Sequence, residues 1–249
     1  MTTHKKWVIG YFIAFIIMIG MNYIVGMSGL DVRDVANNNE AIVQPAGYAF
    51  SIWGLIYLLV LAWIINLFFS KKDKSTITAR LTFWPIANFL LNGAWIFAFT
   101  QEWVFVSVLI IVALLYTLIE IYTSLTAVST QWFDRAPFSI YFGWVTVATI
   151  VNIFTLAIAN HVDTIFGLDE LPWMIIILII ATLIGVAITL SFKDWLYPLV
   201  LVWPFVGIYV KSVGTYTSLD VTLVVISLVL VGAAVSIIVK RWKSLQTRT

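Results

Sequence analysis

Apolar residues in this chain come in long blocks that are separated by short polar stretches. The blocks are about 20 residues long, which is the length that an α-helix needs to cross about 30 Å of hydrocarbon at about 1.5 Å per residue. This pattern predicts membrane-spanning helices. We predict eight of them, at residues 7–27, 47–69, 81–99, 103–123, 138–160, 173–192, 195–211 and 219–239.

Two of these segments allow a second interpretation. The first follows Lys5 and Lys6, as a signal peptide would. It is longer than the usual apolar region of such a peptide and no Ala-x-Ala cleavage pattern follows it, so we expect a retained helix. The segment 195–211 is short and contains Pro198 and Pro204. Because proline removes a backbone donor and kinks a membrane helix, a re-entrant or broken helix is the alternative there.

The charges between the segments predict how the chain lies in the membrane. With the N-terminus in the cytoplasm, twelve basic residues fall in cytoplasmic stretches and only Arg33 and Lys211 fall outside. Cytoplasmic loops of membrane proteins carry such an excess of Lys and Arg. An odd number of helices would place the basic tail at 240–248 on the wrong side. We therefore expect an even number of helices and both termini in the cytoplasm.

Composition supports the same class of protein. Of the 249 residues, 62% are hydrophobic and 10% are charged, whereas about a quarter of the residues are charged in a soluble domain. A net charge of +2 is too small to indicate nucleic-acid binding. The chain has no cysteine, which excludes disulfides and thiolate metal sites within it. We expect an all-α integral membrane protein of a bacterial plasma membrane.

Tryptophan and asparagine residues inside the segments are the candidate functional residues. An indole N–H or a carboxamide in hydrocarbon needs a partner, so these side chains should face the interior of the bundle. Three faces follow helical spacing, namely Trp53 with Tyr57, Asn88 with Asn92 and Trp95, and Trp144 with Ala148 and Asn152. In the predicted orientation they reach a similar depth beneath the loop 28–46, as an apolar pocket with a few polar groups requires. For any single one of these side chains, the alternative is that it only packs in the interior of the bundle and contacts no ligand.

Charged residues and catalytic motifs are scarce in the segments. Glu120 lies near the cytoplasmic end of its segment, and both histidines, His4 and His161, lie outside the segments. Buried ionisable residues usually mark proton relays and ion-coupled transport, so their scarcity argues against both. No metal-ligand spacing, Walker loop or GxSxG motif occurs. We expect no metal site, no catalytic residue of these types and no required cofactor.

Three stretches match a known pattern in order. Residues 45–57, PAGYAFSIWGLIY, resemble the motif Pro-Pro-x-x-x-Phe-x-x-Trp-x-x-x-Tyr, and residues 91–99, LNGAWIFAF, are similar to Leu-Asn-x-x-Trp-x-x-x-Phe. Tyr141, Trp144 and Asn152 resemble a Tyr-x-x-Trp…Asn pattern. These are motifs of the second, third and fifth helices of the translocator proteins, also called TspO/MBR or tryptophan-rich sensory proteins. The first five predicted helices therefore resemble this family.

The resemblance implies a five-helix bundle at residues 1–160, in which the first loop covers a cavity for flat hydrophobic molecules such as porphyrins, haem and, in animals, sterols. Carried onto this chain, the ligand-binding residues would be Trp53, Tyr57, Asn92, Trp95, Trp144, Ala148 and Asn152. The chain departs from the family pattern at two positions. It has the single Pro45 where the family has two consecutive prolines, and it has Ile140 where the family has a proline before the tyrosine. Residues 161–249 would be a three-helix C-terminal extension that packs against the bundle or takes the place of a dimer contact.

Three functions are compatible with these residues. The first is a membrane receptor, transporter or sensor that binds a planar hydrophobic molecule, with porphyrin or haem as the candidate ligand and a homodimer as one option. The alternative is an intramembrane enzyme that acts on a tetrapyrrole or a polyprenyl or lipid-like substrate, since aromatic walls stabilise cations; no acid is visible at the depth of the predicted pocket. The third is a scaffold in which Trp and Asn only pack. The polar loop 28–46 fits a lid and a plain connector equally.

Overall fold

The computed structural model describes residues 2–28, 41–70, 72–128, 131–162, 164 and 167–246. Within these ranges every element of regular secondary structure is a helix. The elements are α1 (Thr3–Met27), the 3-10 helix η1 (Gly47–Ser51), α3 (Ile52–Phe69), α4 (Ser75–Leu81), α5 (Trp84–Thr100), α6 (Val104–Val128), α7 (Trp132–Ala159), α8 (Glu170–Phe192), α9 (Leu196–Ser212) and α10 (Thr217–Gln246). Residues 29–40, which make up most of the loop considered as a lid, lie outside the described residues.

The described helices have the length and composition of membrane spans. Six candidates are long and apolar enough to cross on their own, namely α1, η1 with α3, α6, α7, α8 and α10, and the bent pair of α4 and α5 makes a seventh if it is one span. The remaining apolar helix, α9, has 17 residues and is shorter. Each of the eight predicted segments thus coincides with a helix or a bent pair. The chain is an α-helical membrane protein, while eight crossings and cytoplasmic termini stay predictions.

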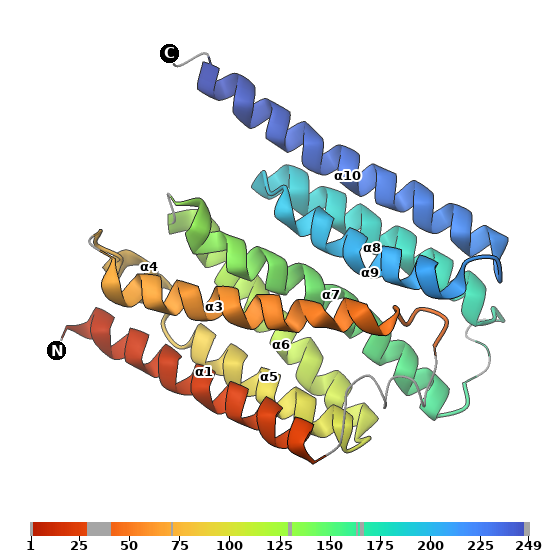
Figure 1. Cartoon of the computed structure of the whole chain (residues 1–249), viewed down its shortest axis with the longest axis horizontal. Coiled ribbons are helices and arrows are strands. Elements are labelled where there is room, and N and C mark those ends of the chain that lie inside the picture. The colour runs from red at the N-terminus through yellow and green to blue at the C-terminus, as the bar shows by residue number, and fades with distance from the viewer. Residues whose placement is uncertain are drawn as a thin grey trace.

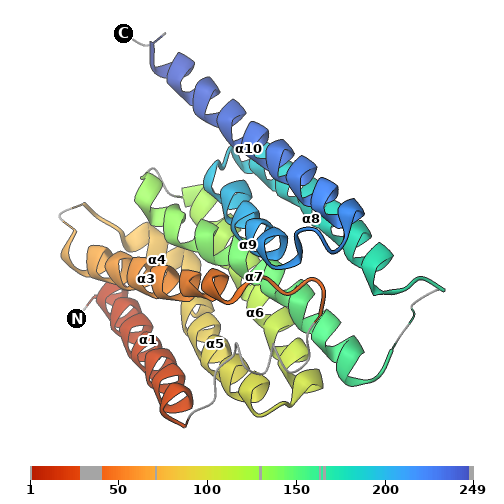
Figure 2. The same ribbon diagram turned by 45° about the vertical axis from the view of Figure 1, so that its right-hand side comes forward.

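The first five spans form a closed ring. Around it, α1 contacts α3, α3 contacts α7, α7 contacts α6, α6 contacts α5, and α5 returns to α1. Figures 1 and 2 show the three C-terminal helices stacked on one side of this ring, with α10 outermost. Helix α9 contacts α7, and α8 and α10 contact α9 and each other. The C-terminal helices thus pack against the bundle through α9, while a role in place of a dimer contact stays a prediction.

The helix break occurs in the third span and not in the seventh. The predicted helix 81–99 corresponds to α5, which is separated from the short helix α4 by Thr82, whose φ is 46° and ψ is −120°, and α4 and α5 meet at 58°. Pro85 follows in the first turn of α5, where its missing N–H costs nothing. The carbonyl of Thr82 accepts a 2.8 Å hydrogen bond from the Tyr11 hydroxyl. In contrast, α9 is continuous despite Pro204 in its interior.

Helix α7 begins six residues before the predicted start at 138, because its charged first turn is paired. Asp134 is buried and forms an ion pair with Lys74, which is also buried. Arg135 Nε lies 3.8 Å from Asp194 Oδ2. A charge that is paired and hydrogen-bonded can be buried, whereas an isolated one cannot. Long-range pairing therefore extends a helix where the local sequence suggests a loop.

The interior of the ring differs between its two ends. At the end where α1 begins, it is filled by side chains that are fully buried, including Tyr11, Trp63 and Phe138. The Trp63 ring meets Phe138 edge-on, with centroids 4.8 Å apart, and lies 6.0 Å from Tyr11. At the other end, where α3 begins, the interior contains a hollow. The packed end holds the helices in the positions that shape this hollow.

Candidate functional site

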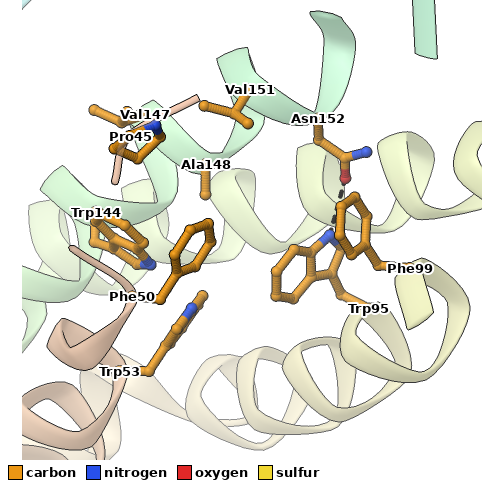
Figure 3. A pocket seen from close by; sticks show the side chains of 10 residues that line it. All are labelled: Pro45, Phe50, Trp53, Trp95, Phe99, Trp144, Val147, Ala148, Val151 and Asn152. Atoms are coloured by element: carbon orange, nitrogen blue, oxygen red, sulfur yellow. Dashed lines mark hydrogen bonds between the residues drawn. The ribbon is translucent and has the colours of Figure 1, made fainter. Parts of the chain in front are cut away.

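An aromatic hollow lies inside the five-helix ring, between α3, α5 and α7 and beside η1. We call it the aromatic pocket. It is lined by ten residues, Pro45, Phe50, Trp53, Trp95, Phe99, Trp144, Val147, Ala148, Val151 and Asn152. Figure 3 shows these side chains converging from separate segments of the chain. None of the ten carries a formal charge, so the lining offers mainly flat apolar faces.

Trp53 is in contact with aromatic rings on two other helices. Its ring centroid lies 5.7 Å from that of Trp95 on α5 and 6.1 Å from that of Trp144 on α7, and it meets Trp144 edge-on. Phe50 meets Trp144 edge-on at 5.9 Å, and Phe99 stacks on Trp95 at 5.5 Å. Offset and edge-on arrangements at such distances are the favourable ones for aromatic pairs. The walls of the pocket are therefore one connected aromatic cluster.

The pocket is closed in this structure. The volume open to the centre of a water molecule is about 20 Å³, which is room for about one water. Trp95 and Trp144 are 4% and 2% exposed, whereas Phe50 and Trp53 are only half-buried. A larger molecule therefore enters only if side chains of the lining move, and Phe50 and Trp53 are the least buried of the aromatic ones.

Asn152 fixes one wall of the pocket through hydrogen bonds. Its Oδ1 accepts a 2.9 Å hydrogen bond from Trp95 Nε1, and its Nδ2 donates to Ser107 Oγ at 3.0 Å. The three residues connect α5, α7 and α6. Trp144 differs, because its buried Nε1 has no hydrogen-bond partner in the part of the chain that the structure describes. The lining thus contains an indole N–H that a bound molecule could use.

A second polar network adjoins the pocket without lining it. Asn92 Nδ2 donates to the Tyr141 hydroxyl at 2.8 Å, and Asn92 Oδ1 lies 3.1 Å from the Tyr57 hydroxyl, which can donate to it. The same hydroxyl lies 3.0 Å from Oδ1 of Asn22, so the network connects α1, α3, α5 and α7. Tyr57 and Tyr141 also contact the ring of Trp53. These residues support Trp53 and do not face the hollow.

The sequence-based candidates are divided between these two sets. Trp53, Trp95, Trp144, Ala148 and Asn152 line the pocket, whereas Tyr57 and Asn92 belong to the adjoining network. Sequence reasoning did not select the lining residues Pro45, Phe50, Phe99, Val147 and Val151. Helical spacing could have identified three of them, because they share a helix face with a selected tryptophan. Phe99 follows Trp95 by four residues, and Val147 and Val151 follow Trp144 by three and seven.

Asn88 shares a helical stripe with Asn92 but has a different environment. Its Nδ2 donates a 2.9 Å hydrogen bond to Thr117 Oγ1 on α6, and its side chain is fully buried. It therefore connects α5 to α6. In the described ranges, no group of three or more His, Asp or Glu side chains could hold a metal ion. The chemistry available at the pocket is stacking, apolar contact and hydrogen bonding.

Comparison with known protein families gives a match. A family model described as TSPO-like protein matches residues 6–238. Neither a curated protein nor a solved structure matches the chain significantly. The matched range contains the whole ring and extends through α8, α9 and most of α10. Because this range is nearly the whole chain and contains the aromatic pocket, the chain belongs to the TSPO-like family.

Proposed function

We propose that the protein binds a planar hydrophobic small molecule, with a porphyrin or haem as the candidate, in the aromatic pocket. Binding of this kind is the step that a membrane receptor, a sensor and a transporter have in common. Membership of the TSPO-like family supports a binding or sensing function in a membrane. The pocket residues support the finer part of the proposal, which is the location of the site and the class of ligand.

One observation carries the proposal. Trp53, Trp95 and Trp144 come from three different helices and meet around a single hollow whose lining is almost entirely apolar. Sites for small hydrophobic molecules are lined by apolar and aromatic side chains with a few polar groups that fix orientation. A polar group of the lining that has no hydrogen-bond partner among the described residues is the N–H of Trp144. A flat ligand with an acceptor at its edge fits this combination.

Binding requires the pocket to open. Because the present free volume holds about one water, a flat ligand has to displace the half-buried rings of Phe50 and Trp53 from their contacts. Stacking of the ligand on Trp95 and Trp144 then replaces the ring contacts that are lost. Aromatic pairs contribute about 0.5–1.5 kcal/mol beyond area burial, so the ring contacts that are lost and the ligand contacts that are gained have similar free energies. The burial of the ligand's own apolar surface then favours binding.

The alternative of an intramembrane enzyme requires a catalytic acid at the pocket. None of the ten lining residues is an acid. The buried carboxylates of Asp134 and Asp194 lie near the opposite end of α7 and are paired with Lys74 and Arg135. No observation therefore favours catalysis over binding, and we propose binding.

A titration with protoporphyrin IX tests the proposal. The purified protein in detergent is mixed with increasing porphyrin, and the shift of the porphyrin absorption band is followed, so that the signal does not depend on the number of tryptophans. We expect saturable binding that Trp95→Ala and Trp144→Ala weaken at least tenfold, because these changes remove the two rings on which the ligand would stack. Trp242→Ala is the control, because this side chain is 64% exposed near the end of α10. Coinciding curves for all four proteins would rule out this pocket.

A further inference from the structure

The chain segment that leads into the aromatic pocket is held by the C-terminal helices. The backbone N–H of Ala46 donates a 3.1 Å hydrogen bond to the carbonyl of Gly207 on α9. The indole N–H of Trp203, also on α9, donates to the carbonyl of Ala49 at 3.0 Å. Glu170, at the start of α8, accepts a 2.6 Å hydrogen bond from the N–H of Ile42. Three hydrogen bonds thus join α8 and α9 to residues 42–49.

Close packing reinforces these hydrogen bonds. A Cβ atom on Gly207 would lie 2.9 Å from Cβ of Pro45 and 3.3 Å from Cβ of Ala49, so a larger residue does not fit without a shift. The ring of Trp203 meets that of Tyr48 edge-on, with centroids 5.2 Å apart. Because proline is a rigid ring, Pro45 cannot move out of the way by changing a side-chain rotamer. The backbone of α9 therefore sets the position of this segment.

The segment that α9 holds is also a wall of the pocket. Pro45 and Phe50 both line the hollow, and the residues bonded to α9, Ala46 and Ala49, lie between them. Phe50 is half-buried, and it is one of the two rings that the proposed opening displaces. No residue of α8, α9 or α10 lines the pocket itself. These helices can therefore act on the pocket through residues 45–50, which α9 holds directly, or through α7, which α9 also contacts and which carries lining residues.

We propose that α9 is a positioning element for the aromatic pocket, in which Trp203 and Gly207 hold residues 45–50 in the closed position and thereby control access to the pocket. As far as it concerns ligand entry, this role of α9 rests on the proposed binding function. Access to the pocket can nevertheless be measured without a ligand. The C-terminal helices then contribute to the site, in addition to the ring of five helices that surrounds it.

The experiment must separate this role from general stabilisation by the C-terminal helices. Gly207→Ala pushes against Pro45, and Trp203→Phe keeps an aromatic ring but removes the indole N–H that donates to the carbonyl of Ala49. Gly185→Ala is the matched control, because its Cβ would meet side-chain atoms of Leu201 at 2.5 Å and Leu230 at 3.0 Å, and so it disturbs α8, α9 and α10 without touching the segment.

A single introduced cysteine reports access to the pocket. The chain has no cysteine of its own, so Ala148→Cys places one thiol in the pocket lining. We expect N-ethylmaleimide to modify this thiol several-fold faster when Gly207→Ala or Trp203→Phe is added, and at an unchanged rate when Gly185→Ala is added. Equal rates in all four proteins, or an equal increase in all three added variants, would overturn the proposal.

Binding of protoporphyrin IX gives the second readout. Because a weaker contact lowers the cost of opening, we expect several-fold faster association with Gly207→Ala and Trp203→Phe than with Gly185→Ala. If protoporphyrin IX binds to none of the proteins, the proposed ligand class fails while the modification rates still decide the role of α9. If it binds to all with the same association rate and the modification rates are also equal, the positioning role of α9 fails while the proposed function stands.

Discussion

Trp95 on α5 and Asn152 on α7 are joined by a 2.9 Å hydrogen bond from the indole N–H to the amide oxygen. Both side chains are nearly inaccessible, at 4% and 1% exposed. Hydrogen bonds between helices in a membrane protein contribute about 0.6 kcal/mol on average and up to about 1.7 kcal/mol. The bond thus fixes one wall of the pocket, whereas the N–H of Trp144 on the neighbouring wall has no such partner among the described residues.

This contrast predicts that Trp95→Phe destabilises the protein more than Trp144→Phe. Both changes remove the same atoms from a buried tryptophan, so the losses of apolar contact largely cancel in the comparison. Only Trp95→Phe also deprives Asn152 of a donor. We expect its free energy of unfolding, measured by titration with dodecyl sulfate, to fall by about 1 kcal/mol more than that of Trp144→Phe. Equal losses would show that the bond contributes nothing.

The helices and much of the pocket could be predicted because both depend on local spacing. Blocks of apolar residues are visible in any window of the sequence, and the faces with Trp53, Trp95 and Trp144 follow from helical periodicity alone. Spacing says which side chains share a face, but it does not say which of them reach the same hollow. Asn92 precedes Trp95 by three residues, yet its amide contacts the hydroxyls of Tyr57 and Tyr141 beside the pocket.

Contacts between distant parts of the chain could not be predicted from the sequence pattern. The pair of Lys74 and Asp134 is 60 residues apart, and the bond from Trp203 to Ala49 spans 154 residues. The first allows α7 to begin at Trp132 through a charged turn that resembles a loop. The second brings α9 to the edge of a pocket to which it contributes no lining residue. Neither has a local signal, because each depends on which helices become neighbours.

Gly143→Ala should destabilise the contact between α7 and α9, although alanine is the better helix former. A Cβ at this position would lie 3.0 Å from Cβ and Cγ1 of Val200 and 3.3 Å from the carbonyl oxygen of Tyr197. Overpacking of this kind costs about 1–3 kcal/mol. The control is Gly54→Ala on α3, where a Cβ meets nothing within 4 Å. Thermal unfolding in detergent should show a lower midpoint for the first variant only, and a midpoint that stays unchanged would contradict this packing.

Removal of one member of the buried ion pair should be costly, and removal of both should be far less so. The side chains of Lys74 and Asp134 are each 3% exposed. Lys74→Met removes the cation that pairs with the buried carboxylate of Asp134, and breaking a buried pair in this way costs about 3–5 kcal/mol in comparable sites. We expect Lys74→Met with Asp134→Leu to recover most of this loss, and Lys72→Met, at an exposed position, to change little. The same unfolding titration measures all three, and a double variant no more stable than Lys74→Met would count against the pairing.

Tyr122→Phe tests whether the hydrogen bond to Asp194 connects the five-helix ring to the C-terminal helices. Asp194 precedes α9, and its carboxylate accepts hydrogen bonds from the Tyr122 hydroxyl on α6 at 2.6 Å and from the N–H of Leu196 at 2.9 Å, with Arg135 of α7 nearby. Hydrogen bonds to charged groups contribute about 1.5–3 kcal/mol, so the loss of the hydroxyl should lower the free energy of unfolding by that amount. Tyr116→Phe is the control, since Tyr116 lies on the same helix and is 53% exposed. Because both substitutions remove one hydroxyl from α6, equal effects would mean that the carboxylate holds α9 in place without the help of Tyr122.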